Sequence, residues 1–223
     1  ANALLATDRS LAEAEARRAE MTGNEYYKRF AAALALMAEG DHNAAAKAWR
    51  KIIKESPDEP TPYHNLGVVL QQSNHHAEAA PMCLKAMELF VEGTEYWAIS
   101  AASAFDLLKH PECHEVPKPE WWNDEDLKAL SARVVAAAPD RSESCSMRAR
   151  VLSMVLSGDA VSKAPWNAGP RTAAEVKEAA TWYRRSAREA QGPADKRVFE
   201  QSARLCDEYA DPLLAKEEAK ATE

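Results

Sequence analysis

The sequence predicts an all-α fold built from paired helices. Alanine, leucine, glutamate, lysine and arginine dominate the 223 residues, and these residue types favour helices. Apolar residues recur at helical spacing, whereas β-branched and aromatic residues nowhere alternate over the length of a strand. Small and large apolar residues also recur after about 34 residues, as they do in a helical repeat. We therefore expect a solenoid of helical hairpins with irregular loop insertions and a capping helix at the C-terminal end.

The clearest unit of this pattern runs from residue 63 to residue 92. Its markers are Tyr63, Leu66, Gly67, Leu70, Ala79, Cys83 and Ala86. One period upstream, the corresponding positions hold Ala33, Leu36, Ala45, Trp49 and Ile52. A further half unit is indicated by Ala12, Ala16 and Ala19 on the run 11–21. Small residues at these positions allow two helices to approach closely beside a large side chain.

This order of residues resembles the tetratricopeptide repeat (TPR), in a divergent form. The resemblance implies a right-handed superhelix of helical hairpins whose surface binds other proteins, and it implies no catalysis. The segment 119–139 is also similar to stretches of TPR-like proteins predicted in unicellular algae. That similarity hints at a eukaryotic source and implies no activity.

Local signals place the elements in order. Residues 1–22 form an N-terminal helix or half repeat, and residues 23–92 form two units. Thr22 and Glu25 have the spacing of a capping box, Gly40 and Asp41 separate two helices, and Pro60 opens another. A third, interrupted unit and the start of a fourth occupy residues 93–156. The rest of the fourth unit, a capping helix over 194–209 and a polar tail occupy residues 157–223.

Composition excludes several function classes. The net charge of -7 argues against nucleic acid and anionic membranes as partners, and no apolar run is long enough for membrane insertion. Four cysteines lie far apart in the sequence, which does not suggest a disulfide framework and suits the cytoplasm or another reducing intracellular compartment. The chain begins with Ala1, as a processed or trimmed product would, so import into an organelle stays open.

The sequence offers little chemistry. The best metal candidates are His110, Cys113 and His114, with His75 and His76 as possible neighbours. Their spacing matches no closed zinc motif and a fourth ligand is not evident. Neither a nucleophile motif nor a phosphate-binding glycine loop is present. We expect no metal, no cofactor and no enzymatic activity.

The resemblance to TPR proteins also predicts where a peptide would bind. The first helix of each unit lines the concave groove in that family, which gives the candidates Tyr27, Phe30, His64, Asn65, Val68, Gln71, Glu95, Arg141 and Arg148. Only Asn65 matches the carboxylate clamp of the chaperone-binding members, so a chaperone-tail adaptor is disfavoured. The alternative is that the N-terminal helix covers Tyr27 and Phe30, which then belong to the core.

Two loops that contain proline carry tryptophan. Trp121, Trp122 and Trp166 either fold onto the helices as plugs or form a partner surface.

Two function classes follow from these expectations. The first is a non-catalytic scaffold or adaptor that binds a peptide or protein segment. The second is a constitutive structural subunit of a larger assembly, for which large apolar patches on the outer helices would be the sign. A metal-binding protein or enzyme is a distant third.

Overall fold

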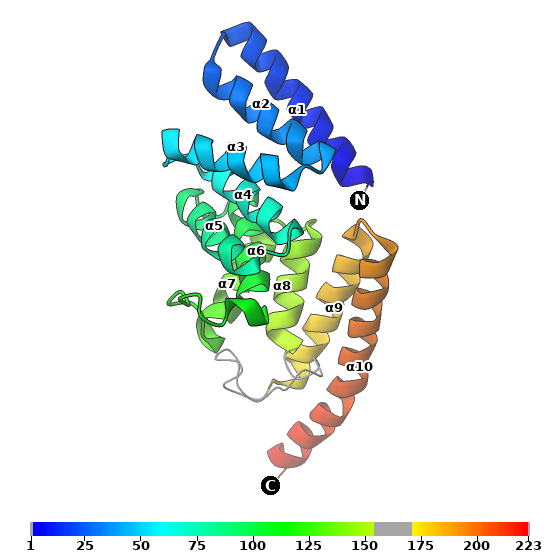
Figure 1. Cartoon of the computed structure of the whole chain (residues 1–223). Coiled ribbons are helices and arrows are strands. Elements are labelled where there is room, and N and C mark those ends of the chain that lie inside the picture. The colour runs from blue at the N-terminus through cyan, green and yellow to red at the C-terminus, as the bar shows by residue number, and fades with distance from the viewer. Residues whose placement is uncertain (1, 154–170, 223) are drawn as a thin grey trace. The chain divides into compact units, whose positions relative to one another are not determined.

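A computed structural model of the chain describes residues 2–153 and 171–222, with side chains from residue 12 onward. Those residues form ten α-helices and one short 3-10 helix, and they contain no β-strand (Figure 1). The prediction of an all-α protein is therefore confirmed. None of the described helices combines the length and the apolarity that crossing a bilayer requires.

The chain divides into two compact units. The first comprises Ala1–Glu92 and Ser103–Val116, and the second comprises Gly93–Ala102 and Pro117–Glu223. Helix α6, Glu95–Leu108, contributes residues to both.

The first unit is a succession of helices in which each packs on the next. The helices are α1 (Asn2–Thr22), α2 (Glu25–Glu39), α3 (His42–Glu55), α4 (Pro60–Gln72) and α5 (His76–Leu89). The 3-10 helix η1, Pro111–Cys113, lies against α5. As predicted, Gly40 ends α2 with a φ of 78°, Asp41 caps α3 by accepting the Ala44 N–H at 3.0 Å, and Pro60 opens α4.

The turn between α1 and α2 differs from the predicted capping box. Asn24 is the residue that caps α2, because its side-chain oxygen accepts the Tyr26 N–H at 2.9 Å. Thr22 still belongs to α1, where its hydroxyl donates to the Arg18 carbonyl at 2.8 Å. The polar residues Thr22 and Asn24 are both good caps, and Gly23, with a φ of 64°, provides the left-handed residue that ends α1 before Asn24.

Aromatic and sulfur-bearing side chains fill the core between α2 and α3. Trp49 is fully buried, and its ring forms a T-shaped pair with that of Phe30, with centroids 5.0 Å apart. The indole N–H of Trp49 donates to the Met37 sulfur at 3.1 Å. Between α4 and α5 the backbones come close at Gly67, where a Cβ would lie 2.6 Å from the Cys83 sulfur.

The second unit contains α7 (Asp124–Ala137), α8 (Ser142–Ser153), α9 (Ala173–Glu189) and α10 (Pro193–Ala221), and each of these packs on the next. Its core between α8, α9 and α10 is made largely of alanine with Leu152, Val176, Tyr183 and Cys206. Helix α9 starts with a complete capping box, Thr172 and Glu175, which the sequence analysis missed. Helix α10 runs without a break as far as Ala221, so it joins the predicted capping helix over 194–209 to the helical polar tail predicted from residue 216.

Candidate functional site

A surface depression lies on the hairpin of α1 and α2. It is an open pocket of about 760 Å³, and seven of its eleven lining residues are alanine. Alanines at i, i+4 and i+7 on each helix form its floor, namely Ala12, Ala16 and Ala19 on α1 and Ala31, Ala35 and Ala38 on α2. Because alanine has only a methyl group, the two backbones leave a shallow apolar groove between them.

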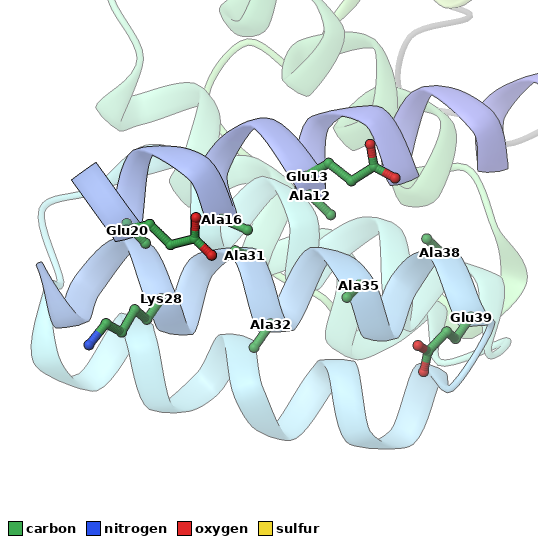
Figure 2. Close-up of a pocket in the computed structure, with 11 residues that line it drawn as sticks. Ala12, Glu13, Ala16, Glu20, Lys28, Ala31, Ala32, Ala35, Ala38 and Glu39 are labelled. Atoms are coloured by element: carbon green, nitrogen blue, oxygen red, sulfur yellow. The ribbon is translucent and has the colours of Figure 1, made fainter. Parts of the chain in front are cut away.

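Charged side chains stand at the two ends of this groove. Figure 2 shows Glu20 and Lys28 near one end and Glu13 and Glu39 near the other. Lys28 is already bound to the carboxylate of Glu25 at 2.7 Å. Three carboxylates against one paired ammonium make the rim of the groove acidic, so an incoming cation would be favoured there.

The predicted peptide-binding residues are divided between the two units. In the first unit, Tyr27 is half-buried with the Arg18 guanidinium 4.2 Å from its ring centroid, which places a residue of α1 over it. Phe30 is buried against Trp49. Asn65 and Val68 on α4 are half-buried and Gln71 is exposed. Their predicted role in binding a peptide stays a prediction.

His64 is the predicted groove residue with the most perturbed chemistry. Burial lowers the pKa of its imidazole from 6.5 to about 4, because the charged ring would lose solvation there. The side chain is therefore neutral at physiological pH, and it would meet a peptide through hydrogen bonds and apolar contact, without a positive charge.

In the second unit, the charged candidates have partners within the protein. Glu95 and Arg141 form an ion pair with each other. Arg148 donates to the Glu178 carboxylate at 3.0 Å and to the Lys128 carbonyl at 2.8 Å. Arg148 therefore ties α8 to both α7 and α9.

A second charge cluster joins the start of α7 to the start of α9. Arg171, whose side chain is 1% exposed, pairs with Asp124. Lys128 reaches Asp124 at 3.6 Å and Glu175 at 2.6 Å. Burial alone would raise the pKa of the Asp124 carboxyl, but the hydrogen bond and charge of Arg171 outweigh it and lower that pKa. These ion pairs link the start of α7 to the start of α9.

The loop tryptophans differ in their exposure. Trp122 is 4% exposed, and Trp121 is half-buried with its ring centroid 5.7 Å from that of Trp122 in an edge-to-face arrangement. The Lys118 ammonium lies 5.8 Å from the centroid of the Trp122 ring. Trp166 lies outside the described residues.

Three metal-ligating side chains meet in the first unit where α5 begins. The ligand atoms of His76, His110 and Glu112 all lie within 4.8 Å of one another. His76 Nδ1 is 3.1 Å from Glu112 Oε2, and the His76 and His110 rings are stacked with centroids 3.8 Å apart. The sequence analysis named both histidines but missed Glu112.

The other predicted metal ligands do not join this cluster. Cys113 is buried in η1, and His114 is exposed with its Nδ1 3.1 Å from the Pro111 carbonyl. A repeat-length signal could have paired His76 with His110, because the two are separated by the TPR period; His42, one period further upstream, is not part of the cluster. Equivalent positions of stacked units become neighbours in space.

Three of the cysteines carry thiols whose pKa is raised by burial. All four are free and buried, and burial raises the pKa of Cys83 to about 12 and the pKa values of Cys145 and Cys206 to about 11. Such thiols stay protonated at neutral pH and are poor nucleophiles.

No protein-family model matches the chain, and no curated protein matches its sequence.

Proposed function

We propose that this chain is a non-catalytic protein-interaction scaffold of TPR-like helical hairpins. Its docking site is the alanine-lined groove between α1 and α2. The groove itself carries the proposal, because it is apolar, about 760 Å³ in volume and open to solvent on the face of a helical hairpin. An apolar groove between two helices suits a third helix, which lays its apolar face into the groove.

The chemistry of the groove defines the partner segment. Its methyl-lined floor admits close approach, so the partner helix would present small or medium apolar residues at i, i+3, i+4 and i+7. The rim carboxylates of Glu13, Glu20 and Glu39 favour lysine or arginine at the flanks of that helix. The partner is thus a basic amphipathic helix of another protein. The net charge of -7 points the same way.

The TPR-like assignment rests on packing as well as spacing. Consecutive helices of the first unit contact each other, and the small residue Gly67 lies against Cys83 where the repeat pattern requires close approach. The buried, protonated thiols suit a reducing intracellular compartment.

A binding selection tests the proposed site. Helical peptides would be displayed as a library against the full chain, and the enriched peptides would be measured by fluorescence anisotropy. Ala16→Trp fills the groove, whereas Ala14→Trp adds the same side chain to an exposed position of α1 that does not line it. We expect the selection to enrich basic amphipathic peptides. These peptides should bind Ala16→Trp at least tenfold more weakly than the unaltered chain, and they should bind Ala14→Trp as tightly as the unaltered chain.

Salt provides a second readout of the same site. Binding should weaken as ionic strength rises, because exposed charge pairs are screened, and Glu20→Lys should weaken it further. Peptides that bind Ala16→Trp as tightly as the unaltered chain would show that the groove is not the docking site.

The second function, a constitutive subunit of a larger assembly, is favoured by an apolar stripe on α10. Val198, Leu205 and Tyr209 follow one another at spacings of seven and four and are 55%, 40% and 37% exposed. Their face differs from the one that Ala203, Cys206 and Ala210 bury. Leu205→Glu should release the chain from such an assembly in gel filtration of cell extract, whereas Arg204→Glu, at the exposed neighbouring position, should not.

A further inference from the structure

The cluster of His76, His110 and Glu112 points to a function beyond the proposed scaffold. His76 is the first residue of α5, and the other two residues belong to η1 or precede it directly. Contact between α5 and η1 brings the two segments together. We propose that these three side chains form a binding site for a divalent transition-metal ion, with Zn²⁺ as the preferred ion.

The donor set supports zinc on chemical grounds. Two imidazoles and one carboxylate are ligands that Zn²⁺ accepts in proteins, and a three-ligand site leaves a fourth position for water. Hard ions such as Mg²⁺ and Ca²⁺ prefer oxygen ligands throughout. The Glu112 side chain is 54% exposed and the His76 side chain 16% exposed, so an ion can reach the cluster from solvent.

The geometry needs only local adjustment. Zinc bonds of 2.0 to 2.2 Å place tetrahedral ligand atoms roughly 3.4 Å apart, and the three donor atoms here already lie within 4.8 Å of one another. The histidine rings are inclined by only 20°, so they must turn about their Cβ–Cγ bonds until the lone pairs converge. That rotation replaces a long hydrogen bond, 3.4 Å from the Glu112 N–H to His110 Nδ1.

A simple ion pair accounts for only part of this arrangement. The contact of 3.1 Å between His76 and Glu112 would serve as an ion pair when the ring is protonated. It leaves unexplained why a second imidazole, His110, stacks on the first at 3.8 Å. A shared metal ion uses all three side chains, and it would fasten η1 to the start of α5.

Zinc titration of the full chain against a chromophoric chelator tests the site. We expect one equivalent of Zn²⁺ to bind saturably. Glu112→Gln and His76→Ala each remove one ligand and should weaken binding at least about tenfold. Glu115→Gln and His114→Ala, exposed neighbours outside the cluster, should stay within about twofold of the unaltered chain. Circular dichroism of each variant checks that the helices are retained.

Cobalt substitution separates this site from a thiolate site. The three ligands predict a Co²⁺ complex without a thiolate-to-metal charge-transfer band, and Cys113→Ser should bind zinc as the unaltered chain does. The proposal is overturned by the absence of saturable uptake, by equal affinity of Glu112→Gln, or by a thiolate band that disappears in Cys113→Ser.

Discussion

The close approach of α4 and α5 at Gly67 allows the effect of substitutions there on protein stability to be predicted. A Cβ at this position would lie 2.6 Å from the Cys83 sulfur, while its next neighbours, the Ala79 oxygen and the Cys83 nitrogen, would be at an ordinary 3.5 Å. Cys83 is fully buried, so its sulfur cannot move into solvent. The added methyl therefore conflicts with one atom alone, and removal of that atom should relieve the conflict.

Two opposing effects on the free energy of unfolding are expected for Gly67→Ala. Gly67→Ala gains about 1 kcal/mol of helix propensity, but overpacking by roughly 1 Å in a tight core costs about 1–3 kcal/mol. The difference is a net loss of up to about 2 kcal/mol in the free energy of unfolding. Cys83→Ala leaves a cavity the size of one atom and should lose about 1 kcal/mol. In the double variant the new methyl occupies the space of the missing sulfur, so its stability should return to within about 0.5 kcal/mol of the unaltered chain.

Urea unfolding of the four proteins, monitored by circular dichroism, measures this coupling. The matched control pairs Gly67→Ala with Cys206→Ala, whose thiol is buried in the second unit. Distant substitutions add within about 0.5 kcal/mol, so this pair should show no rescue. Stabilisation of the protein by Gly67→Ala alone, by the full helix-propensity gain, would contradict the close contact with Cys83. So would simple addition of the Gly67→Ala and Cys83→Ala effects on the free energy of unfolding.

Two further predictions concern buried charge. Burial in the folded chain lowers the pKa of His64 from 6.5 to about 4. Between those pH values the unfolded chain therefore binds a proton that the folded chain excludes. The free energy of unfolding should fall as the pH drops, by about 2 kcal/mol at pH 5. Urea unfolding should show this loss in the unaltered chain but not in His64→Asn. An equal change of the free energy of unfolding with pH in both proteins would refute the prediction. Asp124→Asn removes the Asp124 carboxylate from the buried Arg171 charge and should lower the free energy of unfolding by about 3 kcal/mol. Glu125→Gln changes an exposed residue of the same first turn and should lower it little. Equal losses of stability in thermal unfolding of the two variants would contradict the pairing role of Asp124.

Most of the helical architecture could be predicted because its signals are local. Gly40, Asp41 and Pro60 act through their own backbone or caps, and the apolar spacing of each helix depends only on residues within a few turns. The cap of α2 was predicted wrongly because Thr22 and Asn24 compete for one role and only the path of the chain at Gly23 decides between them. The capping box of Thr172 and Glu175 is also a local signal, since an apolar run with Val176 follows it, but the sequence analysis missed it.

The candidate sites depended on contacts that local patterns do not contain. Glu112 is unremarkable in the sequence until η1 lies against α5 and brings its carboxylate to His76. The predicted groove charges Glu95 and Arg141 bind each other, which spacing along the chain could not reveal. These contacts join residues far apart in the sequence, 36 positions for His76 and Glu112 and 46 for Glu95 and Arg141.

The alanines show how one pattern can serve two purposes. Ala33, Ala45 and Ala79 are fully buried, where small side chains let successive helices approach. The alanines of the groove follow the same helical spacing, yet Ala16 and Ala32 are exposed on the hairpin of α1 and α2. The difference is not in residue type but in whether another helix covers that face. Under the proposed function, the uncovered face of this hairpin is where a partner helix would pack.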